Sequence, residues 1–406
     1  MSENFSKTVV VAMSGGVDSS VAAALLKEQG YDLIGITMGL ACSSKAADRG
    51  CCSFSAAVDA KKIADQLGFP HYTLNLKDDF KHYVIDNFIE EYRSGRTPNP
   101  CIRCNQFLKF DILMRKAKEM GAENVATGHY ARIKSPHPLT QSAPPSPRAN
   151  SKANVGRGIK SDNDIKSLSL WERGEGPVPA GEGFYKLLKG KDPRKDQSYV
   201  LYTMTQEALA HTLFPLGDST KEKVRQKAKE LGLPVAEKEE SQEICFVEDD
   251  DYGRFIREAI PEAVKPGDIV DKAGKVIGRH EGIAFYTIGQ RKGVGAHQGI
   301  PKYVVKIDRE NNQIVVGDQA DLMANELTAE NISLISGEWP VQAMEVAARI
   351  RYNSQEAEAI FYPELGTRST EHRARVIFKK PQRAITPGQS VVFYIGEEML
   401  GGGVIS

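Results

Sequence analysis

Residues 14–20 form a glycine-rich loop, Ser-Gly-Gly-Val-Asp-Ser-Ser, that could hold a phosphate. An apolar run precedes the loop and a helical pattern follows it, so its backbone N–H groups would point out of a helix N-terminus, where anions bind. Gly15 and Gly16 would let the backbone approach a phosphate closely, and the serine hydroxyls add donors. Asp18 would repel a bare phosphate, so we expect it to act through Mg²⁺. The loop lacks the GxxxxGK[ST] pattern of a Walker A motif.

Cysteines supply a second set of chemical groups. Cys101 and Cys104 form a Cys-x-x-Cys pair directly after a turn, residues 97–100, that contains two prolines. The residues that follow have a helical pattern, which would place Cys104 near a helix start, where the thiol pKa falls and the thiolate is favoured. Arg103 and Lys109 add positive charge nearby. The spacing alone also fits two ordinary thiols at a helix start.

The other cysteines are less informative by themselves. Cys245 is flanked by Ile244 and Phe246, and that setting is more typical of a core cysteine than of a reactive one. Three more cysteines lie in a polar stretch, and we assign them no chemistry: Cys42, Cys51 and Cys52. Six cysteines in 406 residues are too few for a disulfide framework.

The elements that must position these groups alternate between strands and helices. Four apolar runs predict strands, at residues 8–13, 33–38, 71–76 and 124–126. Residues 19–29 and 55–67 predict helices, each ended by a glycine, Gly30 and Gly68. This alternation predicts an α/β domain with a parallel, doubly wound sheet, in which ligands bind beyond the carboxyl ends of the strands.

The remainder of the chain predicts further domains. Residues 134–182 are rich in Pro, Ser, Gly and Asn, and we interpret them as a disordered surface insertion. Residues 219–233 predict a well-capped helix. From about residue 283 onward, short strand patterns recur between turn signals, as in a small β-barrel. We expect a catalytic domain over 1–245, a small central α+β domain over 246–307, and a C-terminal β-barrel over 308–406.

Charge and hydropathy exclude several classes of protein. Lys and Arg balance Asp and Glu at 53 each, so general attraction to nucleic acid is excluded and any RNA affinity must come from local basic patches. The sequence contains no run of about 18 apolar residues, so it predicts no transmembrane helix. The N-terminus shows no signal-peptide pattern. We therefore expect a cytoplasmic protein with reduced thiols and no membrane partner.

The loop at residues 14–20 resembles the SGGxDS loop of the ATP pyrophosphatase, or PP-loop, superfamily. More specifically, nine blocks in order resemble the tRNA-specific 2-thiouridylase family, and they cover the chain end to end except for the insertion. These blocks are residues 12–20, 97–110, 126–132, 191–202, 214–225, 241–246, 286–293, 348–352 and 386–394. The likeness implies that the protein uses ATP to replace the 2-oxygen of the wobble uridine of tRNA with sulfur, releasing AMP and pyrophosphate.

The resemblance also implies roles for individual residues. The expected ATP contacts are Ala12, Met13, Ser14, Gly15, Gly16, Val17, Asp18, Ser19, Met38 and Gly128. The expected nucleophile is Cys104, and Cys245 would carry a persulfide. The expected contacts to the target base are Asn99, Pro100 and Cys101, and the expected contacts to the rest of the tRNA are His129, Lys195, Asp196, Gln197, Arg351, Tyr352 and Gln389.

Two sulfur routes are open. In the first, a sulfur-relay protein or a cysteine desulfurase delivers a persulfide to Cys245, Cys104 releases the sulfur, and the two cysteines form a disulfide. In the second, Cys101, Cys104 and Cys245 hold a [4Fe–4S] cluster whose open iron carries hydrosulfide. Some members of the family have Asp where this chain has Cys101, so the cysteine slightly favours the second route.

Two other functions compete. The first is an ATP-dependent amide or lysidine ligase on the same loop, but a ligase would give the three cysteines no task. The second is a redox-sensing RNA-binding protein with a vestigial nucleotide loop. An intact Asp18 and both loop glycines weigh against that reading.

Overall fold

The computed structural model describes residues 8–40, 54–136, 183–238, 244–247, 251–294, 296–297, 300–365 and 372–406. The sequence-based interpretations of Cys42, Cys51, Cys52 and most of the insertion lie outside these residues. The chain divides into a large unit, Met1–Lys134 with Tyr185–Ser406, and the segment Ser135–Phe184. All interactions reported below lie within the large unit.

The N-terminal part is built on a five-stranded parallel sheet, in the order β3-β2-β1-β4-β7. Its strands are β1 (Thr8–Ala12), β2 (Asp32–Gly39), β3 (His71–Asn75), β4 (Asn124–Ala126) and β7 (Thr212–Leu213). The four strands and the parallel sheet expected from the sequence are confirmed. Strand β1 lies in the middle of the sheet, where helices cover both faces. It suits this position because its three consecutive valines are apolar on both faces of the strand.

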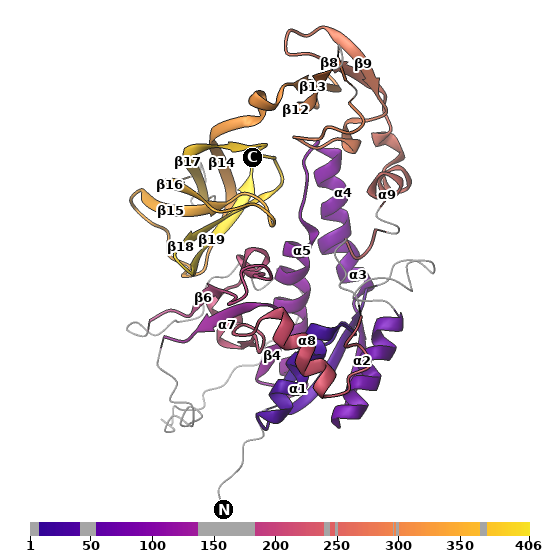
Figure 1. Ribbon diagram of the computed structural model, residues 1–406, viewed down its shortest axis with the longest axis vertical. Coiled ribbons are helices and arrows are strands. Elements are labelled where there is room, and N and C mark those ends of the chain that lie inside the picture. Colours follow the sequence, from indigo (N-terminus) through magenta and orange to yellow (C-terminus); the bar gives the residue numbers. More distant parts are fainter. Residues whose placement is uncertain are drawn as a thin grey trace, which may run out of the picture. The chain divides into compact units, whose positions relative to one another are not determined.

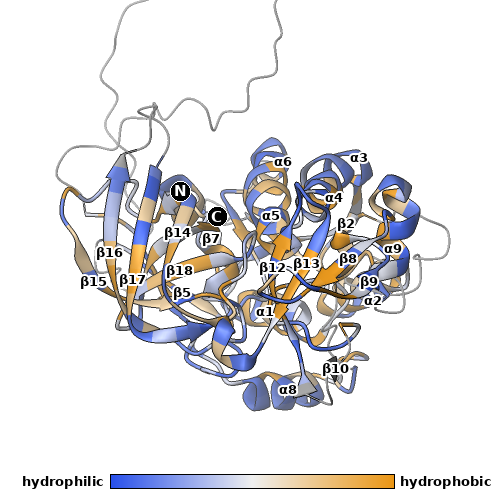
Figure 2. Ribbon diagram, turned by 90° about the horizontal axis from the view of Figure 1, so that it is seen from above, coloured by the Kyte–Doolittle hydropathy of each residue, from blue (hydrophilic) through white to orange (hydrophobic). Residues whose placement is uncertain are grey.

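Helices cover both faces of this sheet. One face packs on α1 (Val17–Glu28), α2 (Phe54–Leu67) and α8 (Lys221–Glu230), with Val9 and Val11 of β1 in the shared core. The other face, with Val10, packs on α6 (Leu113–Glu119), α7 (Gln206–Ala210) and η5 (Ser198–Leu201), and its core includes Val392 and Tyr394 of the barrel. The doubly wound arrangement is therefore confirmed (Figure 1). Helix α8 is hydrophilic over most of its exposed length (Figure 2).

Two long helical segments carry the residues around the Cys-x-x-Cys pair. The first joins α3 (Lys77–Phe80), the π-helical η2 (Lys81–Ile85) and α4 (Asp86–Arg93). The second joins α5 (Pro100–Arg103), the π-helical η3 (Cys104–Ile112) and α6. Cys104 therefore lies one turn inside a continuous helix, close to its start, as expected. The wide π-helical turns are the detail that helical periodicity did not predict, because they displace side chains from a 3.6-residue repeat.

The central part contains a four-stranded sheet in the order β12-β13-β8-β9. Its strands are β8 (Gly267–Val270), β9 (Val276–His280), β12 (Tyr303–Asp308) and β13 (Gln313–Gly317). The short elements beside it are α9 (Tyr252–Ala259), η7 (Pro261–Ala263), η8 (Ile283–Phe285), β10 (Ala296–His297), β11 (Ile300–Pro301) and η9 (Gln319–Leu322). Since the expected boundary at residue 307 falls inside the β12–β13 hairpin, we propose to place it after Gly317.

The C-terminal part is a closed six-stranded barrel. Its strands follow the order β14-β17-β16-β15-β18-β19, and β19 pairs back with β14. Their bounds are β14 (Met323–Leu334), β15 (Met344–Arg349), β16 (Ala357–Leu365), β17 (His372–Arg383), β18 (Ser390–Ile395) and β19 (Glu398–Ile405). Beyond β19 the sheet continues with β6 (Lys186–Lys189) and β5 (Ala131–Lys134), which sequence patterns did not connect to the barrel.

In the part of the chain that the structure describes, helices are too short or too polar for any of them to span a bilayer.

Candidate functional site

The glycine-rich loop lies at the point where the strand order of the parallel sheet reverses. The chain runs outward from β1 through β2 to β3, and then returns to place β4 on the other side of β1. Crevices at such reversals are where open parallel sheets bind ligands. The loop leaves the carboxyl end of β1, and Gly128 follows the carboxyl end of β4. Met38 is buried near the end of β2.

The loop is held by its own serines. The Ser19 hydroxyl accepts from the Ser14 backbone N–H at 3.2 Å and lies 3.2 Å from the Ser14 hydroxyl. Ser19 and Ser20 both donate their hydroxyls to the Gly16 carbonyl, at 3.2 and 2.7 Å. Gly16 is the N-cap of α1 and has no side-chain cap, so the start of this helix has backbone donors to offer an anion.

Two glycines are required by close contacts. Gly15 has φ of 62°, and a Cβ there would lie 2.3 Å from the Ala56 carbonyl oxygen. A Cβ at Gly128 would lie 2.8 Å from the Asp18 carbonyl carbon and the Ser19 nitrogen. Gly15 is therefore excluded from substitution by both conformation and space, whereas Gly128 is constrained by space alone.

Asp18 is engaged by two residues from distant parts of the chain. Lys221 donates from Nζ to both carboxylate oxygens, at 2.7 and 2.8 Å, and the Tyr130 hydroxyl donates to Oδ1 at 2.8 Å. The Lys221 side chain is 8% exposed and that of Asp18 is 32% exposed. The negative charge in the loop is therefore neutralised by a buried ammonium group, which lowers the repulsion of Asp18 toward phosphate.

Sequence reasoning assigned no role to Lys221. It is the first residue of α8, where Thr220 caps the helix and the Lys221 N–H donates to Asp192 at 3.1 Å. A lysine in the first turn of a helix is electrostatically unfavourable, and lysines are seldom buried without a partner. That unfavourable position was the available signal, because it implies a specific acidic partner. Asp192 itself is buried, yet hydrogen bonds from the backbone N–H groups of Lys221 and Arg194 lower its pKa against the effect of burial.

A second lysine contacts the loop from a different segment. Lys238 donates from Nζ to the Gly15 carbonyl at 3.0 Å and to Asp59 of α2 at 2.9 Å. It lies seven positions before Cys245 in the sequence. Lys238 therefore ties the end of the described stretch 183–238 to the phosphate loop.

Met38, Cys104 and Cys245 contact one apolar cluster. The buried members of the cluster are Met38, Leu40, Leu76, Phe80, Val84, Ile85, Leu108 and Ile112. Cys104 and Cys245 are partly buried and pack against it, together with Phe107 and Phe246. The two cysteines, far apart in sequence, are thus brought to the same surface as the residue expected to line the adenosine pocket. An apolar surface of this kind limits water around a reacting sulfur.

The start of the Cys104 helix is capped and positively charged. The Asn99 side chain accepts from the Cys101 N–H at 3.1 Å, and Pro100 follows as the first helical residue. The Arg103 guanidinium lies 4.5 Å above the Phe107 ring. Burial lowers the pKa of Arg103, with Tyr202 and Glu91 acting in the opposite direction, and the group stays cationic. Arg103 therefore brings positive charge to the start of the helix that carries Cys104.

The three cysteines do not form a metal site in this arrangement. Within the described residues, no group of three or more His, Cys, Asp or Glu side chains could hold a metal ion. Cys101 is exposed, whereas Cys104 and Cys245 are partly buried on the apolar cluster. The [4Fe–4S] cluster of the second sulfur route, which the sequence slightly favoured, therefore finds no set of three ligands among the described residues.

Several residues expected to contact tRNA have side chains engaged within the protein. Asp196 is buried and accepts from Gly190, from Ser198 and from Arg349. Gln197 accepts from the Tyr130 N–H at 3.0 Å, and Gln389 donates to the Thr97 carbonyl at 2.8 Å. These contacts assign positioning roles to the three side chains, and contact with RNA stays a prediction for them.

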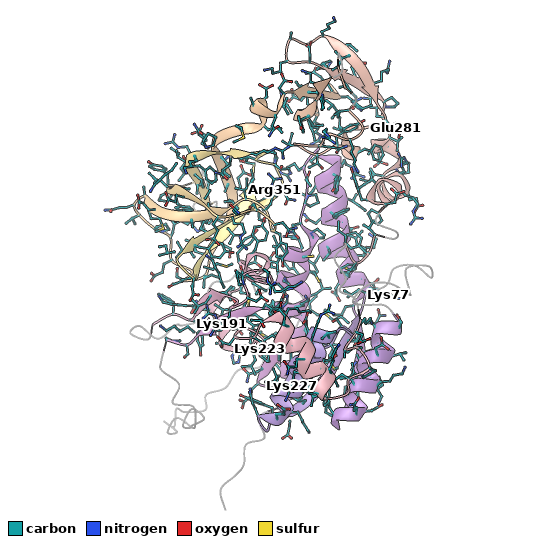
Figure 3. All side chains as sticks on the ribbon, in the orientation of Figure 1. Lys77, Lys191, Lys223, Lys227, Glu281 and Arg351 are labelled. Atoms are coloured by element: carbon teal, nitrogen blue, oxygen red, sulfur yellow. The ribbon has the colours of Figure 1, made fainter. Side chains whose placement is uncertain are left out.

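His129 is also buried, with 8% of its surface exposed. Its Nδ1 shares a hydrogen bond of 2.6 Å with the Thr127 hydroxyl, and Phe110 and Phe214 pack around the ring. Burial, and secondarily Lys109, lowers its pKa well below the usual value, so the ring is neutral at pH 7. Lys195 is half-buried, Tyr352 is exposed, and Arg351 lies on the barrel (Figure 3).

Known proteins and family models match nearly the full length of this chain. Family models match at residues 7–172 and 174–249 (tRNA methyl transferase HUP domain), 253–318 (tRNA methyl transferase PRC-barrel domain) and 324–405 (aminomethyltransferase beta-barrel domain). The tRNA-specific 2-thiouridylase MnmA of Acetivibrio thermocellus is 47% identical over 403 residues, covering 98% of this chain and 99% of the relative. Relatives with the same name from Clostridium acetobutylicum and Clostridium perfringens are 45% and 46% identical over 402 residues, covering 98% of this chain and 99% and 98% of the relatives. The chain therefore belongs to the tRNA-specific 2-thiouridylase family.

Proposed function

We propose that this protein uses ATP to activate the 2-oxygen of the wobble uridine in tRNA and then replaces that oxygen with sulfur. The relatives are named for 2-thiolation of uridine in tRNA. The family models for the first two domains are named for methyl transfer instead. Methyl transfer would need neither a loop for ATP phosphates nor two cysteines on a common apolar surface, so the site favours thiolation.

One observation carries this proposal. Met38, Cys104 and Cys245 share an apolar cluster at the carboxyl end of the parallel sheet, next to the strand that leads into the phosphate loop. A two-step reaction requires this proximity, because the adenylated base must react with sulfur before water reaches it. A ligase that joins an amine would need the loop but gains nothing from the paired cysteines.

The first step forms an adenylate. The uridine O2 attacks the α-phosphorus of ATP, a new P–O bond forms, and the bond to pyrophosphate breaks. We propose that the loop from Ala12 to Ser19 binds the phosphates through the free N–H groups at the start of α1. Lys221 would keep Asp18 from repelling them. Mg²⁺ would neutralise phosphate charge when bound, and Asp18 would have to exchange its contact with Lys221 to act as a ligand to this ion.

The second step replaces AMP with sulfur. A persulfide on Cys245, supplied by a sulfur-relay protein or a cysteine desulfurase, attacks C2 through its terminal sulfur, and the C2–O2 bond breaks as AMP leaves. The Cys104 thiolate then attacks the inner sulfur of Cys245. The bond between the Cys245 sulfur and the sulfur attached to C2 breaks. Its electron pair stays on the sulfur attached to C2, which becomes the C2=S group, and a disulfide joins Cys104 to Cys245. Two electrons must later reduce that disulfide, so an external thiol is a required co-reactant.

Binding of the base is proposed at the turn before the helix that carries Cys104. Gln389 fixes the carbonyls of Thr97 and Pro98, at 2.8 and 3.4 Å, and Thr97 N–H donates to Pro387 at 2.9 Å. Asn99, Pro100 and Cys101 would then form one wall of the pocket for an extruded uridine. The barrel would thus position the base-binding turn as well as bind RNA.

The test is mass analysis of nucleosides. Anaerobically purified protein would be incubated with unmodified tRNA, magnesium ATP and a persulfide donor, and the tRNA would be digested. We expect a uridine that has exchanged oxygen for sulfur, only with ATP. A methylated uridine, or no modified uridine, would refute the proposal.

A matched variant separates the sulfur routes. Cys101→Ser should keep most of the thiolation activity with the persulfide donor, because that route takes no sulfur from Cys101 and serine nearly preserves the size of this side chain in the pocket wall. Activity with inorganic sulfide that is lost in Cys101→Ser would instead support the three-cysteine cluster and contradict the route proposed here.

A further inference from the structure

Three segments that meet beside the base-binding turn carry basic side chains and no acidic ones. They are residues 286–293 of the central part, the turn 351–354 after β15, and residues 383–389 after β17. Together they hold four Lys or Arg residues and no Asp or Glu: Arg291, Lys292, Arg351 and Arg383. Since the whole chain has zero formal net charge, this local excess is a departure from its average composition.

The hydrogen-bond donors of the Arg351 side chain are only partly satisfied. Its Nη2 donates to the carbonyl of Arg383 and, at 3.2 Å, to that of Ala384. Its Nε is buried and has no hydrogen-bond partner among the described residues. Burial, and secondarily the charge of Arg383, lowers the pKa of Arg351. A buried donor without a partner costs free energy, so the hydrogen bonds of Arg351 within the protein do not by themselves account for its position.

Arg383 is close to Arg351 yet is not paired with a carboxylate in the described part of the chain. Its guanidinium is exposed and lies 5.5 Å above the Tyr303 ring. A Cβ at Gly289 would lie 2.9 Å from the Ala384 Cβ and 4.0 Å from Arg383 Nη1, so the 286–293 segment passes directly beside it. The Arg351 side chain contacts the Arg383 main chain, and the charge of Arg383 acts on Arg351, so the two cationic side chains lie close enough to offer a shared site to an anion.

The basic segments are tied to the turn that would hold the base. Thr97 donates from its hydroxyl to that of Thr287 at 3.1 Å, which links the turn to the 286–293 segment. Gln389, at the end of the 383–389 segment, donates to the Thr97 carbonyl. An anion at Arg351 and Arg383 would therefore lie near a nucleotide whose base enters the pocket.

A purely structural role explains less. Arg351 does cap two carbonyls of the chain after β17, and that contact alone would stabilise the barrel. It leaves the buried Nε of Arg351 and the exposed guanidinium of Arg383 without a function. It also gives no reason for acidic residues to be absent from all three segments.

We infer that Arg383, with Arg351 and the turn at residues 289–292, forms a binding site for a backbone phosphate of the RNA that presents the target uridine. This inference rests on the proposed function and adds to it a site for an RNA phosphodiester. Phosphate contacts position an RNA without reading its sequence, so the site would fix the register of the anticodon loop over the turn at Thr97.

The salt dependence of RNA binding tests the inference. Full-length wild type, Arg383→Gln and Arg383→Lys would be titrated with unmodified tRNA at several salt concentrations. Losing one phosphate contact should reduce the slope of log affinity against log salt by about one, and weaken binding roughly five- to tenfold near 0.1 M salt. Arg383→Lys should restore most of the slope, because a single contact needs charge more than a planar fork.

Arg375→Gln is the matched control. Arg375 lies on the same strand, β17, and 5.3 Å above the Tyr362 ring, but it faces Glu364 at 3.9 Å. This variant should leave the slope unchanged. An Arg383→Gln slope equal to that of wild type, or an equal change in Arg375→Gln, would overturn the inference.

RNAs in which one backbone phosphate is replaced by a neutral group would locate the contact. Stem-loop RNAs with single methylphosphonates would be bound to wild type and to Arg383→Gln. One substitution should weaken binding to wild type while having little further effect on the variant, since both changes remove the same contact. The inference would be overturned if the loss of affinity from the methylphosphonate and the loss from Arg383→Gln were additive at every position. It would also be overturned if inorganic phosphate competed with RNA but no methylphosphonate position showed the non-additive effect. Thiolation by wild type would survive such a failure, whereas absence of thiolation in wild type would refute the proposed function itself.

Discussion

The phosphate loop and the cysteine surface are built in opposite ways. The loop is one contiguous segment, residues 12–20, and its own serine hydroxyls and backbone hold it in shape. The cysteine surface joins Cys104, in a helix after β3, to Cys245, which precedes the central domain, and both pack against the same apolar cluster. A local sequence can specify the first arrangement, while the second exists only when the chain is folded.

This difference has a functional meaning. Phosphates are the same in every ATP-using enzyme, so a short loop can be kept as a unit and combined with many second steps. Sulfur transfer to a base needs groups from both sides of a closed pocket, and such groups come from different segments. If this comparison is correct, the two half-reactions should be separable by substitution.

Removing one cysteine should have the largest effect and is the most direct way to break the comparison. We expect Cys245→Ser, and equally Cys104→Ser, to lower thiolation at least about 10³-fold while pyrophosphate release in the first turnover continues. Nucleoside mass analysis and a pyrophosphate assay on the same samples would measure the two steps. Loss of both activities together would show that the regions are not independent.

Changing the loop backbone should have the next largest effect. Gly15→Ala combines a left-handed conformation with a clash against Ala56, so we expect a loss of about 3 kcal/mol in unfolding free energy and a large loss of ATP affinity. Gly30→Ala is the control, because Gly30 also has positive φ, of 81°, but has open space around it. It should cost about 1 kcal/mol. Equal losses by urea unfolding would contradict the steric argument.

The Asp18–Lys221 ion pair tests the comparison further, because it joins a distant lysine to the charged residue of the loop. Lys221→Met should reduce the unfolding free energy by about 2 kcal/mol, less than for a fully buried pair because Asp18 is one-third exposed. ATP affinity should fall as Asp18 regains its full repulsion. A double-mutant cycle with Asp18→Asn should give a coupling of about 1 kcal/mol or more. Strict additivity would mean that the pair is incidental.

His129 should give the smallest effect, a dependence of stability on pH. Its folded-state pKa is depressed below 6.5, chiefly by burial, so below that pH the unfolded chain binds a proton that the folded chain does not. The unfolding free energy should therefore be fully retained above about pH 6.5 and fall as the pH drops, by at most about 1.4 kcal/mol per pH unit. Urea unfolding of wild type and His129→Gln between about pH 5 and pH 7 would measure this. Parallel pH profiles for the two proteins would assign the dependence to other groups.

Local patterns predicted much of the fold. Buried apolar runs predicted strands β1 and β2. Gly30 and Gly68, with φ of 81° and 74°, ended the helices α1 and α2 where expected. Turn signals and alternating residues predicted the strands of the barrel. The joining of β5 and β6 to the barrel, and of β12 and β13 to the central sheet, was not predictable, because strand pairing over long separations leaves no mark on composition or period.

By itself, the sequence determined the phosphate loop, the helix start near Cys104 and the family, because each depends on short-range geometry or on contiguous motifs. Only the tertiary structure decided that Lys221 neutralises Asp18, that Cys104 and Cys245 share one surface, and that Arg351 and Arg383 lie together. Those contacts join residues that are distant along the chain. Their partners are selected by burial and charge in three dimensions, and no spacing in the sequence records that selection.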